Sequence, residues 1–433
     1  MSTKIYDIDP AGNVLCTYTN SEKEAFRSQK TSVPLPRRLL YAFLPAGYPH
    51  SVTPDYLAYQ TYDSLQAFAS TITSLLATRA SLTALGVGDP LSTPTAALLV
   101  QIASSTVSRL ATILFAHRLG TAVQPEAKRY RFLADVLNDG ATLLDLLTPA
   151  LPSYGVKMSV VVGAGVLRAL CGVAAGASKA SLSVHFARGD NLAEMSAKEA
   201  AQETVVSLVG LVVGSGVVRV VTGAGAVWGV VVVLVGVHLG MNYAAVKAVE
   251  LRTLNRQRAT IVFTAWLRGE GVLGPGEVAR RERVLGGGGG RLRSRGGGFT
   301  GSCGFARGYG EVKGVGEAGG YVRYELETEG YFLGVWHRGR YFYMRLAMKE
   351  GGGEGGPLAA WFDAVNHAWH FEEALKGGWQ SHYENAVPVG YVEEEKRRGL
   401  FEALRGKGWD LETNALETRL PVRVRVGEGR KGL

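Results

Sequence analysis

The stretch VVTGAGAVWGVVVVLVGVHLGMNYAAV, residues 220–246, decides the fold of this 433-residue chain. It contains no Asp, Glu, Lys or Arg. Its length exceeds the roughly 20 apolar residues that a helix needs to cross the hydrocarbon core of a bilayer. We therefore predict a transmembrane helix here. Because two more apolar stretches precede it, at 157–178 and 205–218, the sequence indicates a helical membrane domain.

The first of these stretches carries Arg168, and the second adjoins Arg219. A charge at mid-bilayer costs on the order of 3 kcal/mol unless it is paired or reaches the interface. The stretches are therefore spans packed inside a bundle, or a buried hairpin. Glycines four residues apart would let such helices approach closely in lipid. They occur as Gly172/Gly176, Gly210/Gly214, Gly225/Gly229 and Gly236/Gly240. A soluble bundle of buried, Val-rich helices is the alternative.

Three further helical segments lie upstream. Apolar residues recur at helical spacing over 55–85. The stretch 92–116 is apolar but rich in Ser and Thr, and it predicts either a core helix or a weakly hydrophobic span. Between 125 and 149, apolar positions such as Val136 and Leu147 make one face of a charged helix, which predicts a soluble or interfacial helix. Residues 1–30 are polar and unpatterned, so we expect a flexible tail there and a helical domain over 31–270.

The C-terminal part has a different composition. Residues 271–320 are Gly-rich and basic, which predicts a linker. Residues 321–428 read as a small α+β domain, with aromatic-rich strands over 321–347, helices over 357–376 and 393–406, and a final strand at 422–426. The sequence thus predicts a mainly α protein, in which a helical membrane-associated domain is followed by a small α+β C-terminal domain.

The formal net charge of +9 would suit nucleic acid, an anionic lipid surface or an acidic partner. Much of the excess follows the apolar region, at 247–258 and again at 280–295, and this placement favours a membrane-flanking role with lipid as the partner. RNA binding by the Arg-Gly-rich linker is an alternative, but aromatic residues that could stack on bases are sparse within it. We expect no specific nucleic acid.

Cysteine usage and the N-terminus bear on location. Cys16, Cys171 and Cys303 are far apart, so they indicate neither a disulfide framework nor a zinc site. The N-terminus lacks the basic and apolar regions of a secretory signal peptide, and Asp7 and Asp9 argue against a transit peptide. We expect a membrane location reached through internal segments, and the organelle stays open.

Nine polar side chains between two apolar segments form the densest candidate ligand site. In a membrane domain such residues mark a substrate or ion path by default. The alternative is structural, because Ser196 and Glu199 have the spacing of a capping box at a helix start. The candidates are Lys179, His185, Asp190, Asn191, Glu194, Lys198, Glu199, Gln202 and Glu203.

A second set of candidates lies on two other helices. Asp135, Asn138 and Asp139 share a helical face and either bind a cation or cap a neighbouring helix. His238 and Asn242 lie one turn apart near the end of the predicted transmembrane helix, so they either hydrogen-bond another helix or line a pathway.

Motifs for common chemistry are missing from the sequence. The histidines of 367–370 lack the H-E-x-x-H spacing, and we expect no metal. The chain contains neither the G-x-x-x-x-G-K-[ST] nucleotide motif nor a G-x-S-x-G elbow. An ordinary hydrolase, kinase or dehydrogenase is disfavoured.

Four stretches, 45–66, 128–139, 172–204 and 238–258, resemble the root UVB sensitive family over about residues 40 to 260. Tyr62 and Tyr130 stand where Trp looks usual in that family, and Asp190 stands where Asn does. The resemblance implies membrane association and association with itself or with paralogues. Plant members are linked to ultraviolet-B responses, auxin distribution and vitamin B6 homeostasis, and the resemblance implies no reaction.

We therefore expect a non-enzymatic membrane protein that acts as a scaffold or in small-molecule transport. The alternative is a cofactor-linked binding protein or enzyme that handles a form of vitamin B6, with Lys179 or Lys198 and nearby acids in the pocket. The sequence itself identifies no cofactor.

Overall fold

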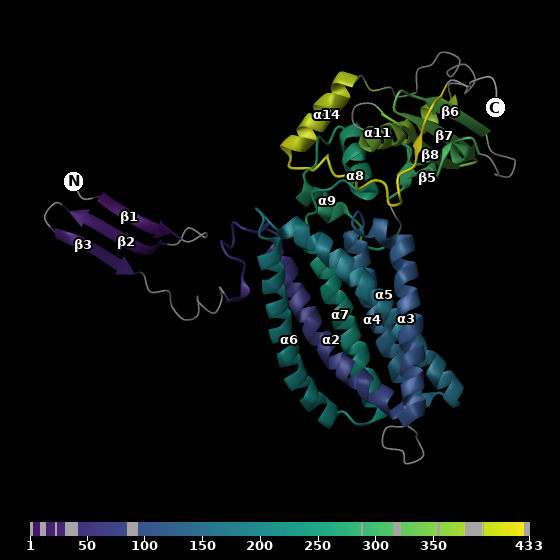
Figure 1. Ribbon diagram of the computed structural model, residues 1–433. Helices are drawn as coiled ribbons and strands as arrows, with labels where there is room; N and C mark the ends of the chain where they lie inside the picture. The colour runs from purple at the N-terminus through teal and green to yellow at the C-terminus, as the bar shows by residue number, and fades with distance from the viewer. Residues whose placement is uncertain are drawn as a thin grey trace. The chain divides into compact units, whose positions relative to one another are not determined.

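The computed structural model describes residues 3–8, 14–21, 24–30, 42–84, 94–286, 289–314, 322–352, 356–376, 392 and 394–427. The chain divides into two compact units, one of Met1–Gly120 with Ala127–Val249 and one of Thr121–Glu126 with Glu250–Leu433. The first is mainly helical and the second combines helices with a sheet (Figure 1). The predicted fold class is confirmed.

The first unit is built from long helices. Helix α2 packs against α4, α6 and α7, while α4 also packs against α5 and α7. The single helix α2 accounts for the periodicity over 55–85. The helices are α2 (Tyr56–Ala84), α3 (Pro94–Val123), α4 (Ala127–Leu147), the short 3-10 helix η1 (Thr148–Ala150), α5 (Tyr154–Phe186), α6 (Leu192–Val220) and α7 (Ala224–Ala248).

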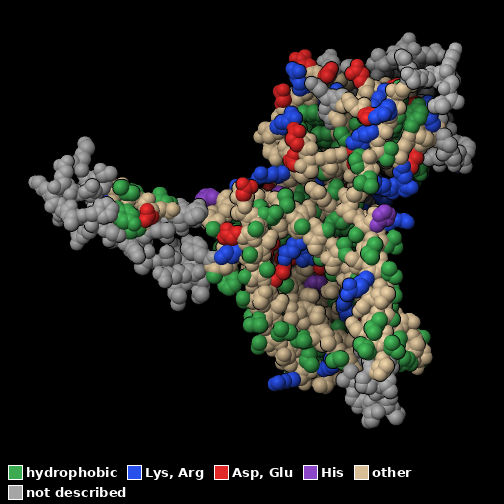
Figure 2. Space-filling model, in the orientation of Figure 1, with side chains coloured by type: hydrophobic (Ala, Val, Ile, Leu, Met, Phe, Trp, Pro, Cys, Tyr) green, Lys and Arg blue, Asp and Glu red, His purple; other side chains and the backbone are tan. Residues whose placement is uncertain are grey.

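Four helices among the described residues are long and apolar enough to cross a membrane. They lie at Leu98–Val123, Tyr154–Phe186, Leu192–Val220 and Ala224–Ala248. Only 11% or 17% of the residues in each apolar window are buried within the structure. Large apolar side chains therefore face outward, and Figure 2 shows few charged side chains over the visible lower part of these helices. Arg168, midway along α5, is paired with Asp145 of α4.

Helix α4 has the opposite orientation to that of a helix at the surface of a soluble protein. Arg131, Asp135 and Asp139 are buried, whereas Val136 and Leu147 are each 41% exposed. In water an amphipathic helix buries its apolar face and exposes its charges. Part of the apolar face, at Val136 and Leu147, is therefore turned outward, while Phe132 of that face is buried in the bundle together with the charged residues.

One of the four glycine pairs packs within the chain. A Cβ atom on Gly210 would lie 2.9 Å from Cβ of Thr71, and one on Gly214 would lie 2.6 Å from Cδ1 of Leu75, so α6 contacts α2 closely at these positions. At the other three pairs, a Cβ atom would meet nothing within 4 Å. At the end of α6, Arg79 of α2 donates to the carbonyls of Val218 and Val221, both at 2.8 Å.

The N-terminal residues, which we expected to be a tail, contain three strands, β1 (Thr3–Ile8), β2 (Val14–Ser21) and β3 (Glu24–Lys30). They form an antiparallel sheet in the order β1-β2-β3. Aromatic and β-branched residues such as Ile5, Tyr6 and Tyr18 favour this conformation. Polar residues lie between these positions, so the sequence does not show a clear strand pattern.

The second unit has a sheet in the order β4-β5-β8-β7-β6, and β9 pairs with the end of β8. The strands from β6 to β8 form the expected antiparallel meander, while β5 and β9 run parallel to β8. The strands are β4 (Arg291–Arg293), β5 (Thr300–Phe305), β6 (Val322–Glu327), β7 (Tyr331–Arg338), β8 (Tyr341–Lys349) and β9 (Arg423–Val424).

Helices complete the core of this unit. Phe263 of α8 packs edge-on against Phe362 of α11 with ring centroids 5.1 Å apart, and both are fully buried with Phe342 and Met344 of β8. The helices are α8 (Arg256–Leu267), α9 (Pro275–Arg281), α10 (Tyr309–Val312), α11 (Gly356–Trp369), α12 (Phe371–Lys376) and α14 (Glu394–Gly406).

The segment 271–320 differs from the linker that its composition suggests. It includes α9, β4, β5 and α10, and Leu292 and Cys303 lie in the core. Burial raises the pKa of the Cys303 thiol to about 12. A Cβ atom on Gly301 would lie 2.4 Å from the carbonyl oxygen of Phe342, so this glycine permits β5 to approach β8. Glycine there serves close packing.

Candidate functional site

The first group of predicted site residues surrounds the turn between α5 and α6. His185, near the end of α5, lies with Nε2 2.9 Å from Oδ2 of Asp55. Asn191 donates through Nδ2 to the carbonyl of Ser51 at 2.9 Å. Asp190 is exposed and has a φ of 48°, a left-handed conformation that Asp and Asn tolerate better than most residues. This turn is therefore held against the segment that leads into α2.

Residues of α6 contact the same segment. Glu194 accepts a hydrogen bond from the amide of Ala46 at 2.8 Å, and Lys198 donates to the carbonyl of Ala42 at 3.1 Å. Gln202 donates to the carbonyl of Phe43 at 2.5 Å. These side chains thus anchor residues 42–46 to the first turns of α6.

The other members of the first group lie between α5 and α6. Lys179 forms an ion pair with Glu203, and buried Glu199 accepts a hydrogen bond from Ser183 at 3.3 Å. Because α6 begins at Leu192, Ser196 and Glu199 lie inside it, and the capping-box interpretation is wrong. The structure distributes the nine residues over several packing contacts and does not gather them around one point.

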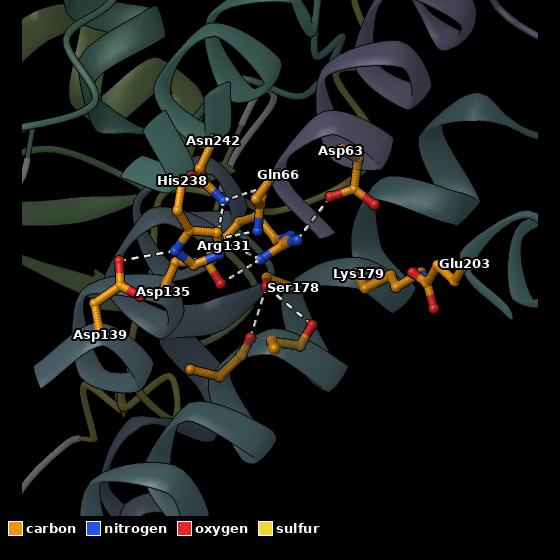
Figure 3. Close-up of polar contacts among 12 residues, drawn as sticks. Asp63, Gln66, Arg131, Asp135, Asp139, Ser178, Lys179, Glu203, His238 and Asn242 are labelled. Carbon is orange, nitrogen blue, oxygen red and sulfur yellow. Dashed lines mark hydrogen bonds and ion pairs between the residues drawn. The ribbon is translucent and has the colours of Figure 1, made fainter. Parts of the chain in front are cut away.

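The second group behaves differently. Asp135 and Asp139 of α4 meet His238 and Asn242 of α7 in the interior of the bundle (Figure 3). Asn138 is half-buried on α4 and is not among the contacting residues drawn there. The two pairs that the sequence places on separate helices therefore belong to one buried network.

Arg131 is the cation of this network. Its Nη2 atom lies 2.7 Å from Oδ1 of Asp63 on α2, and its Nη1 atom lies 3.0 Å from Oδ1 of Asp135. Its Nε atom donates to the hydroxyl of Tyr59 at 3.3 Å. The pairing with Asp135 spans four residues of one helix, a spacing that brings side chains together. Arg131 thereby links α2 to α4.

Asp135 is the point at which three helices meet. Besides Arg131, it accepts hydrogen bonds from Gln66 of α2 and Asn242 of α7. Asn242 also donates to Oε1 of Gln66 at 3.1 Å. Each of these side chains is at most 8% exposed. Burial at this level is costly unless the groups are paired, and the network supplies the partners.

His238 lies between two of the carboxylates of α4. Its Nδ1 atom lies 2.8 Å from Oδ2 of Asp139, and its Nε2 atom lies 3.9 Å from Oδ2 of Asp135. The side chain is 2% exposed. Figure 3 shows the ring between the two acids, with the Lys179–Glu203 pair lying apart from the network.

The network contains more acid than base. Asp63, Asp135 and Asp139 face one guanidinium, and Glu199 adds a carboxylate that interacts electrostatically with Asp63. Lys128, one turn before Arg131, is also buried. Glu199 has Lys179 as its electrostatic partner. Arg131 and Lys128 leave one of the three aspartates uncompensated while His238 is neutral, and a charged His238 would balance all three. The site therefore favours cations and uncharged donors over anions.

Sequence reasoning missed Tyr59, Asp63, Gln66 and Arg131. The i, i+4 spacing of Arg131 and Asp135 was a signal that could have identified the ion pair. The spacing of residues within α2 gives no comparable signal, because the partners of Asp63 and Gln66 lie on α4 and α7, between 68 and 176 residues away.

Comparisons with known proteins cover this part of the chain. Residues 29–270 match the family model described as the vitamin B6 photo-protection and homoeostasis domain. RUS family member 1 of Dictyostelium discoideum is 39% identical over 247 residues, which are 56% of this chain and 47% of the relative. Protein root UVB sensitive 3 of Arabidopsis thaliana is 39% identical over 251 residues, 58% of this chain and 56% of the relative.

A third relative, protein root UVB sensitive 2, chloroplastic, of Arabidopsis thaliana, is 31% identical over 260 residues, 58% of this chain and 58% of the relative. The chain thus spans about half the length of the curated relatives it matches. No solved structure is significantly similar to it. All residues of the buried network fall within the range that the family model matches.

Proposed function

This chain belongs to the root UVB sensitive family, and we propose that its helical unit lies in a membrane and binds and moves a small polar solute. The observation that carries the proposal is the buried network of α2, α4 and α7, enclosed by helices whose outer faces are apolar. Ionisable residues inside membrane bundles are rare and mark substrate or ion paths.

The exposed side chains support insertion into lipid. Ile113 of α3, Val212 of α6 and Val233 of α7 are 66%, 72% and 66% exposed. Contiguous apolar surface of this extent marks an interaction site on a soluble protein, and lipid covers it in a membrane. The buried charges of α4 also support insertion into lipid, because a membrane helix turns its ionisable residues to the bundle interior.

The proposal assigns binding and movement of a solute, without catalysis. The sequence lacks the nucleotide and nucleophile motifs of common enzymes. Lys179 and Lys198, the residues that a vitamin B6 enzyme would use, contact Glu203 and the carbonyl of Ala42 respectively. These contacts support packing roles for both lysines.

The solute class follows from the family description and the local charge. The family model names vitamin B6 photo-protection and homoeostasis. The acid excess around Asp135 favours the unphosphorylated forms of the vitamin, since a phosphate group would add about two negative charges. Hydroxyl and protonated amine groups would donate to the carboxylates. We therefore propose pyridoxine or pyridoxamine as the solute.

The test is uptake into phospholipid vesicles that contain the purified full-length protein. We expect radiolabelled pyridoxine to enter faster than pyridoxal 5′-phosphate, and Asp135→Asn to slow pyridoxine uptake at least about tenfold. Arg129→Ala is the matched control, because Arg129 lies on the same helix and is exposed. Vesicles that take up neither compound above the rate of empty vesicles would overturn the proposal.

A further inference from the structure

We propose that His238, held between Asp135 and Asp139, binds the proton that drives solute movement through the bundle. This inference rests on the proposed function and names its coupling ion. It is built from the geometry of the ring, the charge around it and one buried acceptor that lacks a donor.

The ring is placed to use both of its nitrogens. Nδ1 lies 2.8 Å from Asp139, and Nε2 lies 3.9 Å from Asp135. A neutral imidazole has one N–H, whereas an imidazolium has two. Only Asp139 is within hydrogen-bond distance of the ring, and a protonated ring would in addition attract Asp135 electrostatically across 3.9 Å.

Groups on every neighbouring helix set the charge around the ring. From α2 come Asp63 and the hydroxyl of Tyr59, which both contact Arg131 of α4. From α5, Cys171 interacts electrostatically with Asp135 and Asp139, and Arg168 is paired with Asp145. Arg131 is shared between Asp63 and Asp135, while Asp139 has His238 as its partner. A proton on His238 therefore supplies the positive charge that Asp139 faces.

Asn242 provides an independent observation. It is fully buried one turn after His238, and its Nδ2 atom donates to Gln66 and Asp135. Within the described part of the chain, its Oδ1 atom has no hydrogen-bond partner. Flipping the amide would turn Oδ1 toward two acceptors, so the orientation is fixed by its neighbours. Oδ1 of Asn242 thus lacks a hydrogen-bond donor. A water molecule that carries the proton into the site would supply this donor.

Proton transfer would change the contact between α4 and α7. When His238 releases its proton, the hydrogen bond to Asp139 can remain, but the electrostatic attraction of the ring for Asp135 and Asp139 is lost, and the link between these helices weakens. Protonation of a histidine can shift the equilibrium between two arrangements of a helix pair such as α4 and α7. Solute and proton can therefore act on the same helix pair, which is what coupling requires.

The first experiment measures protonation directly, without any solute. Full-length protein with isotope-labelled histidine is placed in nanodiscs of phosphatidylcholine and phosphatidylglycerol. Imidazole resonances are followed from about pH 8 to about pH 5, the range in which histidine changes charge. His238→Gln identifies the resonance of His238, and His117→Gln serves as the control because His117 is exposed on α3.

We expect the resonances of His238 to change reversibly over this range, and Asp139→Asn to alter that change, because a nearby opposite charge favours the charged ring. A ring that stays neutral throughout, or a change that Asp139→Asn leaves unaltered, would overturn the proposal. Melting curves of both variants establish that they are folded.

The second experiment separates this inference from the proposed function. Pyridoxine uptake into vesicles is measured with and without an inward proton gradient. We expect the gradient to accelerate uptake about fivefold or more in the unmodified protein and to have no effect in His238→Gln. Uptake that ignores the gradient in the unmodified protein contradicts proton coupling while upholding transport. If no uptake occurs, transport fails and the titration still decides whether the proton site exists.

Discussion

At the residue scale, the helical unit depends on Arg131, which compensates the buried carboxylates of Asp63 and Asp135. Removing one partner of a buried ionic network leaves uncompensated charge in a medium of low dielectric. The network is therefore a requirement for stability as well as a candidate site, and its loss can be measured separately from function.

Arg131→Leu should destabilise the protein by roughly 3 to 5 kcal/mol, because two buried carboxylates lose their cation. Arg129→Leu, two residues away and exposed, should change stability by less than about 0.5 kcal/mol. Denaturant unfolding of detergent-solubilised protein measures both. Equal stability of the two variants would contradict the assignment of Arg131.

A second residue-scale prediction concerns the other unit. Burial, and then the neighbouring His370, lower the pKa of His367 to about 4. An unfolded histidine has a pKa near 6.5, so between these values the unfolded chain binds the extra proton and folding loses stability as pH falls. The full stability is present above about pH 6.5, and the loss amounts to at most about 1.4 kcal/mol per pH unit.

His367→Gln should remove this part of the acid sensitivity. Unfolding of the second unit, followed by the fluorescence of its buried Trp361, would be measured at several pH values between about 4 and 7. The exposed His117 of α3 supplies the control variant His117→Gln, which should leave the slope unchanged. If stability depends on pH in His367→Gln as it does in the unmodified protein, another group determines the acid sensitivity.

Inference from the sequence identified two separate sets of polar groups, Asp135, Asn138 and Asp139 on one helix and His238 and Asn242 on another, and did not connect them. Helical periodicity reports which residues share a face of one helix. It carries no information about the partner helix, so Asp63 and Gln66 were not anticipated.

At the element scale, the contact between α2 and α6 explains one glycine pair. Replacing Gly210 by Ala places a Cβ atom 2.9 Å from Thr71, closer than real contacts allow, whereas Gly216 on the same helix has nothing within 4 Å. Gly210→Ala should therefore cost roughly 1 to 3 kcal/mol. Gly216→Ala should stabilise by up to about 1 kcal/mol, because alanine has the higher helix propensity. Thermal unfolding would reveal the difference in sign.

Composition and periodicity did not predict the structure of α4 or of the segment 271–320 in full. The pattern of α4 identified a two-faced helix, but which face is buried depends on whether water or lipid surrounds the bundle, and the pattern does not specify the solvent. The glycines of 271–320 resembled a linker because glycine serves flexible chains and tight packing alike. Gly301 belongs to the second case.

At the scale of the whole molecule, the helical unit has apolar exposed faces and buries a polar network beside apolar clusters, whereas the second unit has an ordinary buried apolar core. The apolar helices and the α+β character of the C-terminal part were predictable because both depend on local composition and period. The network of α2, α4 and α7 depends on how helices pack, which one sequence does not reveal.

The apolar exterior leads to a prediction that distinguishes lipid from water. Val212→Asp, at a position 72% exposed in α6, should cost on the order of 3 kcal/mol if lipid surrounds it. In water the same exposed substitution would change stability by less than about 0.5 kcal/mol. Val426→Asp, 66% exposed in the second unit, is the matched control. The yield of folded protein in the membrane fraction should fall for Val212→Asp alone.

The most direct test of the central claim is flotation of the full-length protein after an alkaline carbonate wash of membranes. If the four apolar helices cross the bilayer, the protein rises with the lipid through a density gradient. If it stays at the bottom, in soluble or aggregated form, the helical unit is not inserted in lipid. The buried network would then require an explanation as the polar core of a soluble protein.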